Sequence, residues 1–201
     1  MPDWDADSPR LRKNLIKVLT GIRDQACARH MPGLADARRW HREMMAGLTP
    51  PDPAMVGRFR GVDPLSDIEI LVGSYPGVAA AQVTAETSRF ADTLAQILTH
   101  LDGHVPPDSA LTPDQLSAVI EACAWAHAEW VRIHPFANGN GRIARLWANA
   151  IAMRYNLPPF IRLRPRPNFG YETASGQAML GNHQPTALAF RRMLVAFLAN
   201  Q

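Results

Sequence analysis

Apolar residues recur at helical spacing over most of the chain. Ser8 and Pro9 form a helix-start signal, because serine caps free N–H groups and proline suits the first helical position. The apolar stripe that follows consists of Leu11, Leu15, Val18, Ile22 and Ala26. A second stripe consists of Ala37, Trp40, Met44 and Leu48. It ends before the proline-rich segment 49–53, so the pattern predicts two N-terminal helices.

The helical period disappears between Gly61 and Gly77. Residues 68–72 are rich in β-branched side chains and bounded by turn residues, which predicts a short strand and one arm of a hairpin. Helical spacing then returns with Phe90, Leu94, Ile97 and Leu101. We expect Gly103 and the prolines at 106 and 107 to end this helix.

The clearest helix start lies at Thr112, which is followed by Pro113 and by Gln115 at the capping-box spacing. One face of this helix carries Leu116, Ile120, Cys123, His127, Trp130 and His134. Proline at 135 disfavours the helical conformation at the preceding residue, so the helix should deliver His134 into a loop. Further helices are predicted at about 142–155, 171–180 and 185–198. The expected fold class is mainly α, with one short β-hairpin.

Composition narrows the class of protein. The chain has 201 residues, 47% of them apolar and 19% charged, which suits one compact unit rather than a disordered or coiled-coil chain. Cys27 and Cys123 are far apart and form no metal or redox motif, which favours a reducing compartment. The acidic start of the chain and the lack of a long apolar run favour a cytoplasmic protein without a membrane partner.

The net charge of +3 gives only weak support for an anionic partner, and nucleic acid is not favoured. The placement of charge is more informative. Residues 134–145 read HPFANGNGRIAR, in which Gly139 and Gly141 flank Asn140 at the start of a helix. Backbone N–H groups at such a start can bind an anion.

Arg142 and Arg145 fall in the first turn of that helix, where their charges oppose the helix dipole. A bound polyphosphate would neutralise both. His134, at the other side of the loop, is suited to accept a proton near neutral pH. Together these residues favour phosphoryl or nucleotidyl transfer to a hydroxyl group, whereas a plain helix–loop–helix corner would leave the histidine and the arginines unexplained.

This segment resembles the signature of the Fic (Fic/Doc) family, H-x-F-x-[D/E]-G-N-G-R-x-x-R. It matches at His134, Phe136, Gly139, Asn140, Gly141, Arg142 and Arg145. The resemblance implies a helical bundle with a β-hairpin flap over the active site. We expect a Fic domain at 35–201, preceded by an N-terminal helical extension at 1–34.

The resemblance implies AMPylation, the transfer of AMP from ATP to a Ser, Thr or Tyr hydroxyl of a target protein. His134 would be the general base, and Phe136 would anchor the loop in the core. The nucleotide would be bound by Gly139, Asn140, Gly141, Arg142, Arg145 and Tyr171, with Asn140 near the α-phosphate and Tyr171 beside the base. The target would align on the flap at Ile70, Leu71, Val72 and Gly73 by strand addition.

Asn138 occupies the position where the signature has an acidic residue that holds Mg²⁺. An amide oxygen can bind a hard cation but brings no charge, so Asn138 is expected to be a weaker metal ligand. The lysine of the phosphorylating Doc branch is also absent here. The alternative to an adenylyltransferase is therefore a weakened or inactive module that binds nucleotide or protein.

Members of the resembled family are often inhibited by a helix bearing [S/T]-x-x-x-E-[G/N], whose glutamate pairs with the second motif arginine. None of the six glutamates has the required following residue: Glu43, Glu69, Glu86, Glu121, Glu129 and Glu172. We therefore expect any such inhibition to come from a separate, antitoxin-like chain, as in toxin–antitoxin pairs.

Other polar residues allow two interpretations. His127 lies one heptad before His134, and its apolar face favours a core histidine over a second base. The alternating Arg162, Arg164 and Arg166 favour a solvated face, with phosphate or target contact as the alternative.

Overall fold

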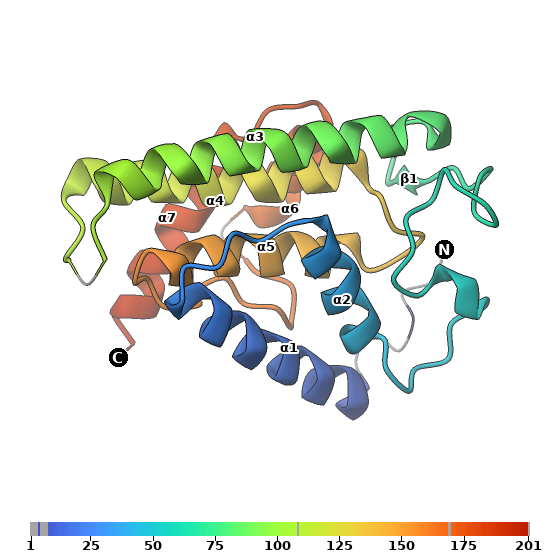
Figure 1. The fold of residues 1–201 in the computed structure, drawn as a ribbon, viewed down its shortest axis with the longest axis horizontal. Coiled ribbons are helices and arrows are strands. Elements are labelled where there is room, and N and C mark those ends of the chain that lie inside the picture. Colours follow the sequence, from blue (N-terminus) through green and yellow to red (C-terminus); the bar gives the residue numbers. More distant parts are fainter. Residues whose placement is uncertain (1–3, 5–7, 108, 169, 201) are drawn as a thin grey trace.

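Two antiparallel helices joined by the 134–139 loop form the centre of the fold (Figure 1). The computed structural model describes residue 4 and residues 8–107, 109–168 and 170–200. Helix α4 (Pro113–Ile133) runs toward the loop, and α5 (Asn140–Arg154) runs back from it. The capping box predicted at Thr112 is present at the start of α4. This pair brings His134 and the start of α5 to one end of the bundle.

The remaining helices cover the central pair. Helices α1 (Pro9–Cys27) and α2 (Leu34–Met44) pack on α5, and α3 (Val83–His104) packs on α4. Helices α6 (Tyr171–Met179) and α7 (Gln184–Leu198) also pack on α4. The apolar stripe predicted for the first helix is the buried face of α1. The mainly α fold class is therefore confirmed.

Aromatic rings fill the centre of the core. The ring of Trp147, on α5, lies 4.9 Å from that of Trp40 on α2 and 5.3 Å from that of Phe90 on α3. Trp130, on α4, completes the group at 5.6 Å from Trp147. Because α2, α3, α4 and α5 each contribute one of these large rings, burial of the rings fixes these four helices on one another. The motif loop therefore sits on a well-packed base.

The first strand of the hairpin is shorter than the strand predicted at residues 68–72. Strand β1 (Leu71–Val72) pairs with β2 (Tyr75–Pro76), with Leu71 opposite Pro76 and Val72 opposite Tyr75. Residues 68–70 are not part of the strand, although the Gly77 N–H donates to the carbonyl of Ile70 at 2.9 Å. The Ile68 backbone is engaged elsewhere, because its carbonyl accepts from Arg60.

Three helix boundaries also differ from the pattern. Helix α2 ends at Met44, and Leu48 lies beyond a turn in which Gly47 has a positive φ of 69°. Helix α3 continues through Gly103 to His104, so the glycine does not end it. Helix α5 begins at Asn140, because Gly139 caps it with a left-handed backbone. Short 3₁₀ turns occupy Pro53–Met55 and Ala80–Gln82.

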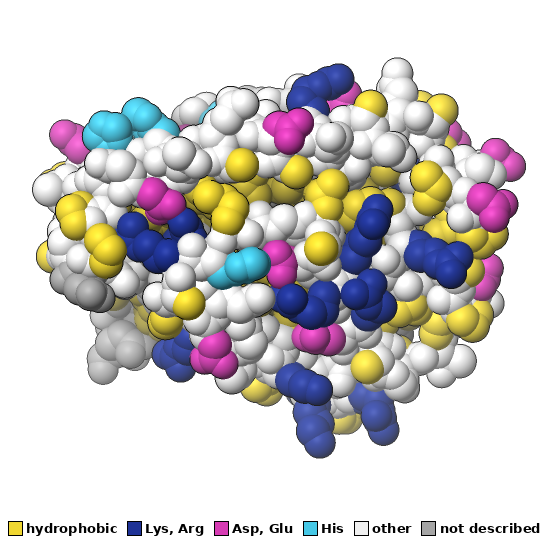
Figure 2. All heavy atoms as spheres, viewed as in Figure 1, with side chains coloured by type: hydrophobic (Ala, Val, Ile, Leu, Met, Phe, Trp, Pro, Cys, Tyr) yellow, Lys and Arg dark blue, Asp and Glu magenta, His cyan; other side chains and the backbone are white. Residues whose placement is uncertain are grey.

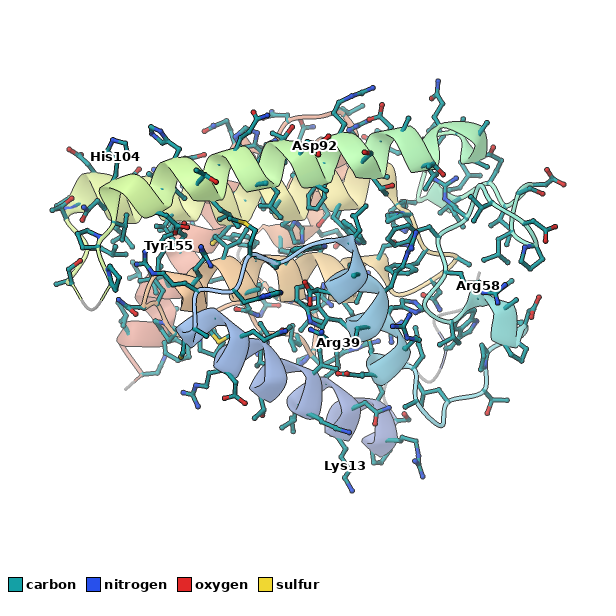
Figure 3. The ribbon with its side chains drawn as sticks, in the orientation of Figure 1. Lys13, Arg39, Arg58, Asp92, His104 and Tyr155 are labelled. Carbon is teal, nitrogen blue, oxygen red and sulfur yellow. The ribbon has the colours of Figure 1, made fainter. Side chains whose placement is uncertain are left out.

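Exposed basic side chains gather over α1 and α2 in the view of Figure 2. Lys13, on α1, and Arg39, on α2, are labelled in Figure 3. Arg39 is paired with Asp36 at 2.7 Å, so part of this charge is neutralised. Within the described residues, no helix combines the length and the apolarity needed to cross a bilayer. The acidic start noted in the sequence lies, apart from Trp4, outside the described residues.

Candidate active site

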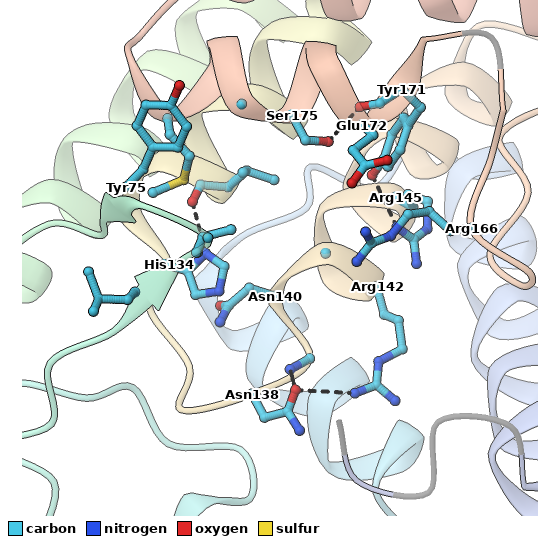
Figure 4. A pocket seen from close by; sticks show the side chains of 18 of the residues that line it. Tyr75, His134, Asn138, Asn140, Arg142, Arg145, Arg166, Tyr171, Glu172 and Ser175 are labelled. Carbon is cyan, nitrogen blue, oxygen red and sulfur yellow. Dashed lines mark hydrogen bonds between the residues drawn. The ribbon is translucent and has the colours of Figure 1, made fainter. Parts of the chain in front are cut away.

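A cavity of about 550 Å³ opens between the hairpin, the motif loop and helix α6 (Figure 4). Its lining includes nearly all of the predicted site residues, which come from distant parts of the chain. They are Leu71, Val72, Gly73, His134, Asn138, Gly139, Asn140, Gly141, Arg142, Arg145 and Tyr171. Ile70 is not among the lining residues in the described part of the chain, since it precedes β1.

His134 occupies the C-cap position of α4 in a left-handed conformation, with φ 54° and ψ 55°. Its Nδ1 lies 2.9 Å from the carbonyl oxygen of Val131. A carbonyl only accepts hydrogen bonds, so this contact assigns the ring proton to Nδ1 and leaves Nε2 as the basic nitrogen. Burial, assisted by the charge of Arg60, lowers the pKa of His134 to about 4. His134 is therefore neutral at pH 7 and able to accept a proton.

Phe136 and Asn140 hold the motif loop in shape. Phe136 is fully buried, and its ring stacks on His41 at 4.0 Å. The Asn140 side chain accepts from the Phe136 N–H at 2.9 Å and donates to the Phe136 carbonyl at 2.7 Å. This reciprocal pair uses the Asn140 side chain within the loop. A contact between Asn140 and a phosphate would therefore come from its backbone N–H at the start of α5.

Helix α2 forms the floor below this loop. The Nδ1 atom of His41 accepts from the Gly57 N–H at 2.9 Å, so Nε2 carries the ring proton and donates to the Asn138 carbonyl at 3.1 Å. Gly139 has φ 81°, and a Cβ there would lie 2.9 Å from the Met44 side chain. The left-handed backbone conformation is the reason for glycine here, because the methyl end of the flexible Met44 side chain can move aside.

Arginines supply most of the cavity's charge. Arg142, in the first turn of α5, and Arg145, in the next turn, are 3% and 5% exposed, and Arg164 and Arg166 also line the cavity. Glu172 is the acidic residue among the described lining residues. A cavity with four guanidinium groups and one carboxylate favours a polyanionic ligand.

Arg145 is held in place by two contacts. Its Nη1 donates to the Tyr171 hydroxyl at 3.0 Å, and its Nη2 donates to the Leu163 carbonyl at 3.0 Å. The Tyr171 hydroxyl also lies 2.6 Å from Nε2 of His127. Burial lowers the pKa of His127 to about 3, so the neutral ring accepts the tyrosine proton. This geometry supports the interpretation of His127 as a core histidine. Through the Tyr171 hydroxyl, His127 also helps to hold Arg145 in place.

The segment that carries Arg164 is tied to α5 by Asn149. The Asn149 amide donates to the Ile161 carbonyl at 2.7 Å and accepts from the Ile161 N–H at 3.1 Å. Together with the Arg145 contact to Leu163, this fixes the chain on both sides of Arg162. Of the three alternating arginines, Arg164 and Arg166 line the cavity, whereas Arg162 is exposed and is not among its lining residues. Because Arg166 is also exposed, contact with phosphate or target stays a prediction.

The residues around Asn138 fit a metal ion poorly. The Asn138 Oδ1 accepts from the Gly139 N–H at 2.5 Å and lies 3.5 Å from Nη2 of Arg142. A cation at this oxygen would displace one hydrogen-bond donor and face a guanidinium charge. The described residues contain no group of three or more acidic, histidine or cysteine side chains placed to hold a metal. Asn138 as a metal ligand stays a prediction.

Two residues with clear structural roles at the site were not identified from the sequence. His41 supports the motif loop from α2, and Arg60 contacts the backbone on both sides of His134. Both side chains are fully buried although both are polar. A buried polar residue with specific partners is the signal that identifies them, and burial is visible only in the fold.

Over residues 33–152 the sequence matches the Fic/DOC family, and the chain belongs to this family. A curated relative is Protein adenylyltransferase fic-1 of Caenorhabditis elegans, which is 31% identical over 150 residues. The match covers 75% of this chain and 25% of the relative, so the chain spans about a quarter of that protein's length.

Solved structures show the same fold. One is a Fic domain containing signaling protein from Bacteroides thetaiotaomicron, with a TM-score of 0.61 and 20% identity, covering 95% of this chain and 67% of the other. Another is the BepC protein from Bartonella tribocorum with bound AMPPNP, with a TM-score of 0.56 and 18% identity, covering 92% and 84% of the two chains. At these identities the likeness concerns the fold alone.

Proposed function

We propose that this chain is a protein adenylyltransferase that transfers AMP from ATP to a Ser, Thr or Tyr hydroxyl of a target protein. The observation that carries the proposal is the position of a neutral His134 in a cavity lined by the start of α5 and four arginines. Membership of the Fic/DOC family supports it, as does the name of the Caenorhabditis elegans relative. The AMPPNP bound to the BepC protein supports ATP as the nucleotide.

In the proposed reaction the hydroxyl oxygen of the target attacks the α-phosphorus of ATP. A new P–O bond forms as the bond from the α-phosphorus to the bridging oxygen breaks, and pyrophosphate leaves. His134 accepts the hydroxyl proton on Nε2. The backbone N–H groups of Asn140 and Gly141 bind the phosphates, and Gly139, whose N–H is bonded to Asn138, shapes the turn before them. Arg142 and Arg145 stabilise charge on the departing pyrophosphate. Because the fit around Asn138 is poor, no step is assigned to a metal ion.

The hairpin is proposed to align the target. Leu71 is 73% exposed, and Val72 and Gly73 line the cavity beside His134. An extended segment of the target could pair with the exposed edge of β1 by main-chain hydrogen bonds. Such pairing would bring a hydroxyl side chain to the Nε2 side of His134.

The proposal is tested by incubating the purified chain and a cell lysate with ATP labelled at the α-phosphate, and in parallel at the γ-phosphate. We expect labelled protein bands only with the α-label, and none with His134→Ala. His100→Ala, on the exposed face of α3, is the matched control and should label normally. Bands with the γ-label would indicate phosphorylation instead, and α-label bands that persist in His134→Ala would contradict the proposed base.

The second candidate, a module that binds nucleotide without transferring it, is favoured by Asn138. In that case the wild-type chain would bind ATP but label nothing, and Asn138→Asp would create labelling.

Regulation by a separate antitoxin-like chain is also proposed. Among the described residues, Glu172 is the carboxylate that lines the cavity together with Arg145, so it is the one to test for inhibition within the chain. A many-fold rise in labelling on Glu172→Gln would show inhibition within the chain and contradict the separate inhibitor.

A further inference from the structure

Arg60 is a fully buried arginine that lies behind His134, outside the proposed nucleotide contacts. Its Nε donates to the His134 carbonyl at 2.8 Å, and its Nη2 donates to the Ile133 carbonyl at 2.9 Å. Its own backbone N–H donates to the Pro135 carbonyl at 2.8 Å. One residue therefore binds three consecutive carbonyl groups where α4 ends. These groups have no intrahelical donor, so the arginine satisfies the exposed end of the helix.

The same guanidinium also holds both ends of the hairpin. Its Nη1 donates to the Ile68 carbonyl at 3.3 Å, before β1, and its Nη2 donates to the Val78 carbonyl, after β2. Glu69, which is 63% exposed on its side chain, lies 3.6 Å from Nη1 and balances the charge. Arg60 is thus the point at which the hairpin and the His134 backbone are joined.

Gly77 gives an independent indication that the hairpin is seated closely on this junction. A Cβ at Gly77 would lie 3.1 Å from Nη2 of Arg60 and 3.2 Å from Cβ of His134. The backbone conformation there does not demand glycine, because its φ is not positive. A side chain at Gly77 would require Arg60 or His134 to shift by a few tenths of an ångström, so glycine lets the hairpin backbone lie close against both residues.

We propose that Arg60 is a positioning residue that holds the hairpin in register with His134, so that a segment bound on the hairpin is presented to the base. The effect on catalysis rests on the proposed function. The coupling of the hairpin to the His134 backbone through Arg60 does not. An arginine suits this role because its planar group carries five donors, enough to bind several carbonyls in fixed directions. A lysine would keep the charge but offers one nitrogen in place of three.

Arg154 provides a matched comparison within the chain. It is 4% exposed, it donates to the His30 carbonyl at 2.9 Å, and it is paired with Asp102. Arg154 lies at the end of α5 away from the cavity and touches neither the hairpin nor His134. Arg154→Lys should therefore lower global stability without affecting the hairpin, which separates a positioning role from a structural one.

The coupling is tested by amide hydrogen exchange, which needs neither ATP nor a target. In Arg60→Lys we expect the Gly77 amide, bonded to Ile70, to exchange at least about tenfold faster than in Arg154→Lys at matched global stability. Equal exchange in the two variants would overturn the proposal. Should Arg60→Lys fail to fold, Gly77→Ala provides the same test, with Gly21→Ala in open space on α1 as its control.

The catalytic consequence is tested by the α-label assay with ATP as the varied substrate. In Arg60→Lys or Gly77→Ala, the labelling rate at saturating ATP should fall at least about tenfold while the half-saturating ATP concentration stays unchanged. A rise of about tenfold in the half-saturating ATP concentration would show that Arg60 acts in nucleotide binding, and it would contradict the positioning role. If wild-type labelling is absent, the proposed function fails, but the exchange experiment still decides the coupling.

Discussion

Two helix ends meet beside the cavity, and each is accompanied by buried arginines in opposite electrostatic settings. At the end of α4, Arg60 lies against carbonyl groups at the negative pole of the helix dipole. At the start of α5, Arg142 lies in the first turn, at the positive pole, which disfavours its charge, and Arg145 lies in the next turn. An anion bound at this helix start would offset the unfavourable interaction with the dipole.

The comparison separates the parts that build the site from the parts that bind its ligand. Arg60 uses its donors on protein carbonyls, so its removal should damage the structure around His134. The arginines of α5 are held partly by the protein, as Arg145 is by Tyr171, and are proposed to serve a polyphosphate. Substitutions at the two ends should therefore change different quantities: at Arg60 the local structure around His134, and at Arg142 or Arg145 the affinity for the nucleotide.

The largest expected effect on binding is that of Arg142→Gln. Loss of a charged partner should weaken ATP binding roughly tenfold to a hundredfold, because hydrogen bonds to charged groups contribute about 1.5–3 kcal/mol. Calorimetric titration with ATP measures the affinity. Arg191→Gln, on α7, is the control and should bind ATP as the wild type does; an unchanged affinity in Arg142→Gln would contradict the comparison.

The pH dependence of labelling follows from His134. The base must be neutral, and its pKa is lowered from the ordinary value of 6.5 to about 4. Activity should therefore persist at pH 5.5, where an unperturbed histidine would be about tenfold less available as a base. The acid limb of kcat/KM for the free protein should lie near pH 4. A limb near pH 6.5 would mean that the ring is more exposed to water than the structure shows.

Protein stability has its own pH dependence. It must be measured alongside the pH profile of labelling, because unfolding at low pH would also lower activity. His41 and His127 have folded-state pKa values lowered to about 4 and about 3 by burial. In the unfolded chain they bind protons below about pH 6.5, so stability is complete above that pH and declines as the pH falls. Denaturant unfolding at pH 7.5 and pH 5.5 measures the decline, and a more stable protein at pH 5.5 would contradict the neutral, buried state of these rings.

A smaller effect is expected for Asn138→Asp. The carboxylate would add a negative ligand beside the phosphates, so the variant should respond to lower Mg²⁺ concentrations than the wild type, by several-fold. ATP binding and α-label transfer, each measured across a Mg²⁺ titration, provide the comparison. Asn156→Asp, distant from the motif loop, is the control. An unchanged Mg²⁺ response would show that position 138 does not contact the cation.

The smallest effect on ATP binding is expected for Tyr171→Phe. The change removes the hydroxyl that joins Arg145 to His127 and leaves the ring in place. ATP binding should weaken up to about tenfold, because a single intramolecular hydrogen bond contributes about 0.5–1.5 kcal/mol net. Tyr155→Phe, which removes a hydroxyl bonded near Asp102, should not alter ATP binding. A larger loss for Tyr155→Phe than for Tyr171→Phe would contradict the assignment.

The helices were largely predictable because their apolar stripes are local patterns. The Leu11 to Ala26 stripe and the capping box at Thr112 correspond directly to α1 and α4. The motif residues were likewise predictable, since they are adjacent in the sequence. The division of the chain at residue 34 stays a prediction, although α1 packs directly on α5.

The supporting residues were not predictable, because their partners are distant in sequence. His41 contacts a loop 97 positions away, and Arg60 contacts a carbonyl 74 positions away. No periodic pattern encodes such a pair. The first strand of the hairpin was predicted too long for the same reason. Its residue Ile68 is held by Arg60, which is not part of a partner strand.

The most direct test of the proposed reaction is mass spectrometry of the protein that receives the α-label. With the wild-type chain we expect an AMP group on a Ser, Thr or Tyr oxygen, and with His134→Ala we expect no adduct. A phosphate adduct, AMP on another type of side chain, or an undiminished adduct with His134→Ala would contradict AMP transfer with His134 as the base.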